Sequence, residues 1–147
     1  MKKILIILAI LLALGAVGVY IGYKYYYNKP HTDYASKEAE IKIVAKRLWL
    51  DYSMNKDIAA PRYDDKIIEI NGTIMNLEEA NNQIIVVFAF KRGDFGDEGI
   101  RVTMLPEYNQ AAKAINPFKP IKIKAHCIGF NGQDVLMDNG SIVEAQK

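Results

Sequence analysis

The heptapeptide KAHCIGF, residues 124–130, contains two residue types that can do nucleophilic chemistry. Cys127 is the single cysteine of the 147-residue chain, and His126, one of its two histidines, stands directly before it. A histidine that takes the proton of a thiol leaves a thiolate, which is a strong nucleophile. The sequence therefore raises the question of whether these two side chains can meet.

The surrounding residues answer this question with a strand pattern. Apolar and polar residues alternate through PIKIKAHCIGF, residues 120–130, which is typical of a β-strand. Adjacent strand residues point to opposite faces, so His126 is not expected to reach the thiol. Cys127 is predicted to fill the core as a small apolar side chain, and burial is expected to keep its thiol un-ionised. The residues expected to share its face are Ile121, Ile123 and Ala125.

A second stretch whose residue types could do chemistry is the acidic segment RGDFGDEG, residues 92–99. Its carboxylates suggest a cation site, and DFG occurs in the magnesium site of kinases. The rest of a kinase is missing, and the segment lacks the alternate spacing of a calcium loop. We predict a solvated hairpin loop here. We therefore expect no enzyme, with no catalytic residue, no cofactor and no metal site.

The N-terminus carries a long apolar run. Residues 4–23, ILIILAILLALGAVGVYIGY, have no charge and match the ~20 residues that a helix needs to cross a bilayer. Five tyrosines cluster at the far end, where aromatic rings favour the headgroup region. Residues 1–27 are predicted to be a membrane anchor. Lys2 and Lys3 favour a cytoplasmic N-terminus, with the domain on the periplasmic or extracellular side of a bacterial membrane.

A cleaved signal peptide is the alternative reading of the same run. Ala16-Val17-Gly18 offers small residues at the positions that a signal peptidase reads. The run is longer than the usual signal core of about 7 to 15 residues and ends in an aromatic belt, which favours an uncleaved anchor. No cysteine stands directly after the run, so a lipoprotein is excluded.

The remaining chain divides into a linker, residues 28–36, and a domain, residues 37–147. An amphipathic helix is predicted from Lys37 and is expected to break near residues 55–61. Five strands and a second helix follow. The strands are predicted at residues 66–77, 83–91, 100–105, 120–130 and 133–145, with an interruption at residues 138–140, and the helix at residues 106–115.

The first of these strands contains Asn71-Gly72, which is also a common hairpin turn. The alternation continues in phase across this dipeptide, which favours one long strand with a bend at Gly72. The predicted chain is mainly β with two helices. Its element order is that of a five-stranded OB-fold Greek-key barrel, preceded by the N-terminal transmembrane helix and the amphipathic helix.

Several motifs also resemble a known family. YDDKIIEINGTI, residues 63–74, GIRVTM, residues 99–104, and PIKIKAHCIGFNGQDVLMDNGSIV, residues 120–143, look like the tRNA-anti-like family. The resemblance covers residues 48–143 and implies an OB-fold, commonly behind an anchor or signal sequence in Bacteroidetes. It implies no catalytic residue. This chain has Val102 or Thr103 where the family often has a cysteine, and residues 118–120 where it often has Gly-Asp.

An OB-fold that binds single-stranded nucleic acid presents aromatic rings and cations on its second and third strands. The possible ligand-binding face here consists of Lys91, Arg92, Phe95, Arg101 and Phe130, whereas Phe88 and Phe90 are expected in the barrel core. Of the 19 basic residues, three lie in the anchor, which leaves 16 against 17 acidic residues in the rest of the chain. Such a balance disfavours a polyanion ligand.

These observations together predict a membrane-anchored binding or scaffold module of the bacterial cell envelope that is not an enzyme. The membrane is contacted through residues 4–23, and the expected partner is a protein or a glycan. A single-stranded nucleic-acid-binding OB domain is the alternative.

Overall fold

The computed structural model describes residues 14–20 and 34–145. Residues 14–20 are helical. The rest of the predicted anchor, residues 1–13 and 21–27, lies outside the described residues, as does most of the predicted linker. Within the described ranges no helix is long and apolar enough to cross a membrane. The contacts divide the chain into two units, Met1–Asp33 and Tyr34–Lys147, and the second unit holds the folded domain.

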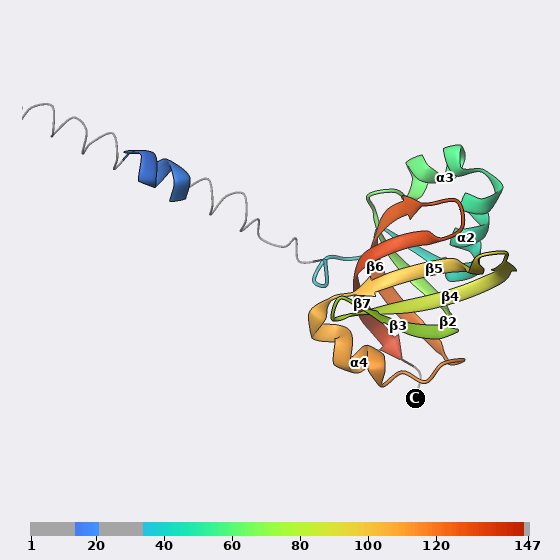
Figure 1. Cartoon of the computed structure of the whole chain (residues 1–147). Coiled ribbons are helices and arrows are strands. Elements are labelled where there is room, and N and C mark those ends of the chain that lie inside the picture. The colour runs from blue at the N-terminus through green and yellow to red at the C-terminus, as the bar shows by residue number, and fades with distance from the viewer. Residues whose placement is uncertain (1–13, 21–33, 146–147) are drawn as a thin grey trace, which may run out of the picture. The chain divides into compact units, whose positions relative to one another are not determined.

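Residues 34–145 form seven strands and four short helices (Figure 1). A mainly β chain is therefore confirmed, but with more elements than the predicted five strands and two helices. The helices are α2 (Ala45–Met54), α3 (Lys56–Tyr63), the 3-10 turn η1 (Pro106–Tyr108) and α4 (Asn109–Lys113). The strands are β1 (Ile41–Val44), β2 (Ile67–Thr73), β3 (Asn76–Ala80), β4 (Gln83–Gly93), β5 (Gly96–Met104), β6 (Pro120–Phe130) and β7 (Val135–Ala145).

The strands lie in the order β1-β2-β6-β7-β5-β4-β3. Because β2 and β3 follow each other in the chain, the two ends of this order approach one another and the sheet curls into a barrel. β5 and β7 run parallel, whereas β4 pairs antiparallel with β5 and β6 with β7. With the short β1 set aside as an addition and β2 and β3 counted as one bent strand, this is a five-stranded Greek-key barrel with a helix between its third and fourth strands.

The predicted long first strand is wrong in one respect, because it breaks after Thr73 and resumes at Asn76. Asn71-Gly72 makes no hairpin turn, since β2 runs through it. Gly72 packs where no side chain fits: a Cβ there would lie 2.9 Å from the Cβ of Ala45 and 3.1 Å from the ring of Phe88. The face predicted for this strand is confirmed, because Ile68, Ile70 and Ile74 are fully buried.

The predicted helix from Lys37 is also wrong at its start. Residues 41–44 form a strand that pairs in parallel with β2, and the helix begins at Ala45. The spacing of Ile41 and Ile43 fits both a helix and a strand, and pairing with β2 stabilises the strand. The predicted break is confirmed at Asn55, whose side chain accepts a hydrogen bond of 3.3 Å from the Ile58 amide and caps α3.

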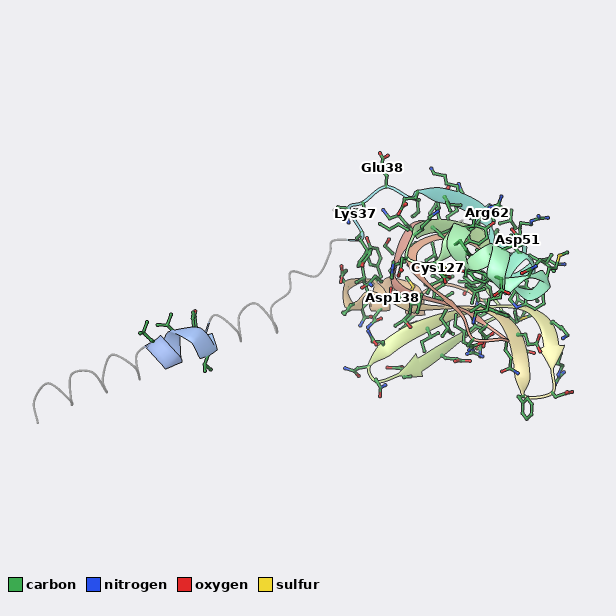
Figure 2. The ribbon with its side chains drawn as sticks, turned by 90° about the horizontal axis from the view of Figure 1, so that it is seen from above. Lys37, Glu38, Asp51, Arg62, Cys127 and Asp138 are labelled. Carbon is green, nitrogen blue, oxygen red and sulfur yellow. The ribbon has the colours of Figure 1, made fainter. Side chains whose placement is uncertain are left out.

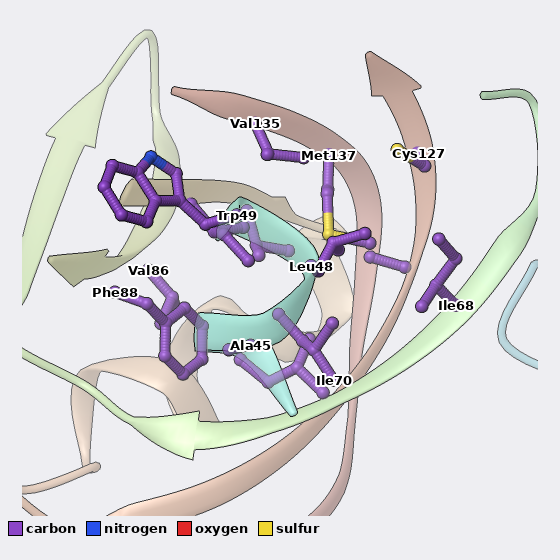
Figure 3. Close-up of a cluster of buried hydrophobic side chains, with 14 of the residues drawn as sticks. Ala45, Leu48, Trp49, Ile68, Ile70, Val86, Phe88, Cys127, Val135 and Met137 are labelled. Carbon is purple, nitrogen blue, oxygen red and sulfur yellow. The ribbon is translucent and has the colours of Figure 1, made fainter. Parts of the chain in front are cut away.

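Helix α2 supplies much of the core. Leu48, Trp49 and Tyr52 are buried, and Figure 3 shows Leu48 and Ala45 directed at the side chains of the surrounding strands. The Trp49 indole N–H donates a hydrogen bond of 3.0 Å to the backbone carbonyl of Gln133 in the β6–β7 turn. Burial of these large side chains fixes α2 against one end of the barrel.

Two further predictions need correction. The segment 92–99, predicted as a loop, continues β4 and β5, and only Asp94 and Phe95 form the turn between Gly93 and Gly96. The interruption predicted at residues 138–140 does not end β7, which runs on to Ala145. Asn139 has a φ of 51°, and the pairing of β7 with β5 shifts between Val102 and Met104, so the strand bulges and continues.

Candidate binding groove

Cys127 and His126 lie on opposite faces of β6, as predicted. Cys127 is fully buried, and Figure 3 places it in the core cluster that includes Ile68 and Met137. His126 lies on the outer face, with its Nδ1 2.9 Å from a carboxylate oxygen of Asp138 and its ring 5.1 Å from that of Tyr34. The two side chains therefore form no catalytic pair.

The Cys127 thiol belongs to a buried polar contact with α2. Its Sγ lies 3.4 Å from the hydroxyl of Tyr52, which donates a short hydrogen bond to Asp64. Burial raises the pKa of the Cys127 thiol from 9.0 to about 11, although the Tyr52 contact acts in the opposite direction. The thiol therefore stays protonated at neutral pH, as the sequence predicted.

The five residues predicted as a ligand-binding face do not form one surface. Lys91, Arg92 and Phe95 lie on the β4–β5 hairpin, where Phe95 is 92% exposed at the turn. Lys91 pairs with Glu98 on the facing strand at 3.3 Å. Phe130 stacks on Tyr52 with ring centroids 5.7 Å apart and packs against the core. Phe88 is buried as predicted, while Phe90 is half-buried beside Trp49.

Arg101, at the middle of the predicted face, is held by two carboxylates. Its guanidinium donates to Glu78 at 2.6 Å and to Asp134 at 2.9 Å, and it is 28% exposed. Asp134 also accepts a hydrogen bond of 2.8 Å from the Gly99 amide. The hydrogen bond to Glu78, more than that to Asp134, raises the pKa of Arg101 above its ordinary value. Its charge is therefore neutralised within the fold.

An apolar groove of about 340 Å³ lies elsewhere on the barrel. Its side chains come from the end of β1, the start of α2, the bend between β2 and β3, the end of β4 and the loop before β6. Three of its apolar side chains are exposed to solvent: Val44, Met75 and Phe118. The full lining is Val44, Lys46, Gly72, Thr73, Ile74, Met75, Ala89, Phe90 and Phe118.

The groove follows an uncovered edge of β2. The β1–β2 register ends at Val44 opposite Asn71, whereas β2 continues to Thr73. On the other edge, Ile74 donates to the carbonyl of Lys119 at 3.4 Å and accepts from the amide of Phe118 at 2.8 Å. Backbone groups of successive residues alternate between the two edges. The amide and carbonyl of Thr73 therefore point toward the groove.

One cation stands at the rim of the groove. Lys46 lies in the first turn of α2 and is exposed, and residues 34–145 give it no ion-pair partner. No side chain caps this helix end, and its first turn has no acidic residue. The positive end of the helix and Lys46 therefore act in the same direction and favour an anion.

The sequence analysis missed this groove. Phe118 stands between two prolines in NPFKP, residues 116–120, and an aromatic residue in such a turn was the available signal. Its φ of 69° places a bulky side chain in the left-handed region, which only a well-held backbone tolerates. Val44 and Met75 gave no comparable signal, because their exposure depends on where β1 and β2 end.

The strand order, the bent first strand and the helix between β5 and β6 define an OB-fold. The chain belongs to the tRNA_anti-like family, whose sequence model matches residues 1–142. The resemblance found in the sequence is thereby confirmed. No curated protein sequence matches the chain.

Solved structures with a similar chain path include aminoacyl-tRNA synthetases. A protein described as an aspartyl-tRNA synthetase from Leishmania major Friedlin is 11% identical with a TM-score of 0.47, over 79% of this chain and 22% of its own. The aspartyl-tRNA synthetase of Entamoeba histolytica is 11% identical with a TM-score of 0.41, over 82% and 24%. The asparaginyl-tRNA synthetase of Pyrococcus horikoshii is 15% identical with a TM-score of 0.37, over 59% and 22%. This chain thus spans less than a quarter of each.

Proposed function

We propose that this chain is a binding module without catalytic activity in the bacterial cell envelope. Residues 4–23 anchor it in the membrane, with the N-terminus in the cytoplasm and the domain on the periplasmic or extracellular side. The groove carries this proposal: Val44, Met75 and Phe118 leave apolar surface in contact with water, and such surface favours a partner that covers it.

The character of the groove supports a protein partner. A glycan presents many hydroxyl groups that need hydrogen-bond partners, whereas most residues that line this groove are apolar. Phosphates need several free cations, whereas Lys91 and Arg101 on the β4–β5 sheet are both paired with carboxylates. The apolar side chains of a protein match the apolar lining of this groove better than a glycan or a nucleic acid does.

The alternative function is binding of single-stranded nucleic acid. The observation that favours it is the β4–β5 hairpin, which carries Arg92 near the end of β4 and the exposed ring of Phe95 at its turn. Aromatic rings can stack on bases, and cations can follow the phosphates. The same hairpin also carries Asp94, Asp97 and Glu98, which weakens its field for a polyanion.

Oligonucleotide binding separates the two functions. The full chain in phosphatidylcholine nanodiscs is titrated at low salt with labelled oligothymidylate and oligouridylate of about 12 nucleotides, within the span of an OB-fold. We expect no saturable binding. Saturable binding that falls with added salt and is lost in R92E/F95A, but kept in the surface control K56E, contradicts the proposal.

Membrane topology is tested in intact cells. Mass spectrometry of the mature protein is expected to find the N-terminus at Met1 or directly after it. A protease added from outside, after opening of any outer membrane, is expected to degrade the domain. A mature N-terminus near residue 19, or a domain protected from the protease until the cytoplasmic membrane is opened, contradicts the anchor and its orientation.

A further inference from the structure

The groove geometry points to a specific kind of occupant: an extended peptide segment that pairs with the free backbone groups of Thr73 at the edge of β2, places a bulky apolar side chain in the groove and sets a carboxylate beside Lys46. This inference rests on the proposed function and defines the chemistry of the partner.

The backbone of β2 has groups at Thr73 that an added strand can bind. β1 covers β2 only as far as Asn71, and β4 takes over at Met75, whose amide donates to the carbonyl of Val87 at 2.9 Å. Between these two strands, Thr73 has no strand neighbour on that side within residues 34–145. The amide and carbonyl of Ile74 bond to Lys119 and Phe118 on the other edge, and the backbone groups of successive residues alternate between the two edges. The amide and carbonyl of Thr73 are therefore directed to the groove, where an added strand can pair with them.

The side chains that line the groove also favour such a peptide. Phe90, Phe118 and Met75 border the space next to this edge, and its volume of about 340 Å³ lies within the range of natural ligand pockets. In strand addition, main-chain hydrogen bonds hold the peptide and pockets select alternate side chains. A bulky apolar side chain fits this combination, and a polar one leaves the walls uncovered.

The positive charge of Lys46 at the groove is complementary to a carboxylate of the peptide. Lys46 borders the groove and has no ion-pair partner within residues 34–145, although Lys42 on β1 is paired with Glu69 and Arg47 with Asp51. The uncapped N-terminus of α2 adds positive potential at the same place. One carboxylate satisfies this charge. A nucleic acid strand would need several cations along its length.

The conformation of Phe118 also favours contact with a partner. It is 72% exposed with a φ of 69°, and its amide is fixed by the hydrogen bond to the carbonyl of Ile74. A bulky residue in the left-handed region costs stability, on the order of 1 kcal/mol, and a solvent-exposed ring brings no burial in return. The ring is therefore placed for a contact that forms with a partner.

Fluorescence anisotropy on the full chain in phosphatidylcholine nanodiscs tests the inference. The probe is a fluorescein-labelled hexapeptide that alternates threonine with valine and phenylalanine and ends in glutamate with a free carboxyl terminus. One companion ends in a lysine amide, and another carries N-methyl groups on its central amides. We expect the acidic probe to bind at least tenfold tighter than either companion, which corresponds to about 1.4 kcal/mol.

Variants place the binding in the groove. F118N is expected to weaken binding about tenfold while the protein stays folded, because asparagine tolerates the left-handed backbone. K46E is expected to reverse the preference between the glutamate and lysine peptides. The matched controls are F95N, an exposed aromatic residue on the hairpin, and K56E, an exposed lysine on α3, and both should bind like the unaltered chain.

The inference is overturned if the acidic probe does not bind, if the N-methyl companion binds equally well, or if F118N and K46E leave binding unchanged. If a neutral peptide binds in a Phe118-dependent way, the carboxylate chemistry is wrong and the proposed protein-binding function stands. If oligothymidylate binds and K46E or R92E abolishes this binding, the proposed function fails as well.

Discussion

Ala45, the first residue of α2, packs directly on Gly72 of β2. A Cβ at Gly72 would lie 2.9 Å from the Cβ of Ala45, so the helix start and the strand approach as closely as their backbones allow. β1 therefore ends at Val44, and its side of β2 is left uncovered at Gly72 and Thr73, until the Met75 amide bonds to Val87 of β4. This contact between a helix and a strand shapes the groove.

Replacement of Gly72 by alanine is expected to destabilise the fold. The added methyl group meets Ala45 and the ring of Phe88 at 3.1 Å, so it forces both to shift, at a cost of about 1 to 3 kcal/mol. Urea unfolding followed by fluorescence of the buried Trp49, the single tryptophan, measures this cost. The control is N71A, an exposed neighbour on the same strand. Equal stability of G72A and N71A would mean that α2 can move away from β2.

Arg101 is expected to contribute to stability rather than to ligand binding. R101M removes the hydrogen-bonded partner of Asp134, which is 8% exposed, and should cost about 2 kcal/mol. The comparison variant is E78Q, which removes the charge of the more exposed partner of Arg101 and should cost less than about 1 kcal/mol. The free energy of unfolding in urea distinguishes them. If R101M is as stable as the unaltered chain but no longer binds the peptide probe, Arg101 contributes to ligand binding and the prediction is wrong.

Alkaline pH is expected to weaken the fold through Cys127. Because its folded pKa of about 11 exceeds the ordinary value of 9.0, its contribution is full below pH 9 and is lost as pH rises through 11. The loss amounts to about 2 to 3 kcal/mol. Burial also raises the pKa of Tyr52 and Tyr63, so their contributions decline in the same direction at higher pH.

The variant C127A isolates the contribution of the thiol. At pH 7 it should be less stable than the unaltered chain by about 1 kcal/mol, because a small cavity replaces the sulfur. This difference should shrink and then change sign between pH 9 and 11, since both tyrosines remain in the variant. A difference that stays constant over this range would show that the thiol does not ionise on unfolding as described.

The segment that enters the domain is expected to be protected by Lys124. Its ammonium group donates to the carbonyls of Ala35 at 2.8 Å and of Lys37 at 2.6 Å, and Tyr34 packs on the neighbouring His126. Figure 2 shows Lys37 and Glu38 at the edge of the domain, apart from Cys127. The side chain of Lys37 is already exposed, and K124M should free the backbone of this segment, so trypsin cleavage after Lys37 should accelerate several-fold. K119M is the control, and an equal cleavage rate in both variants would contradict this role of Lys124.

Local periodicity predicted those parts of the fold that depend on neighbours in sequence. The alternation of β6 placed Cys127 inside and His126 outside, and the phase of β2 placed Ile68 and Ile70 in the core. The start of α2 was missed because isoleucines at 41 and 43 fit both a strand and a helix. Only pairing with β2, more than twenty residues along the chain, decides between them.

The candidate site was harder to predict because distant residues define it. Arg101 looked available as a cation, yet its partners Glu78 and Asp134 stand 23 and 33 residues away. The groove depends on where β1 ends relative to β2 and on the loop that carries Phe118. Neither relation has a periodic signal in the sequence, so both emerge only from the packed structure.

The most direct test of the account is to map where the acidic hexapeptide contacts the domain. Methyl NMR spectra of the full chain in nanodiscs are recorded with and without the peptide. We predict shifts at the groove methyl groups of Val44, Met75 and Ala89, whereas Leu136, which lies opposite Arg101 on the β5–β7 sheet, should stay unchanged. Shifts at Leu136 with none at Met75 and Ala89 would contradict the groove as the binding site.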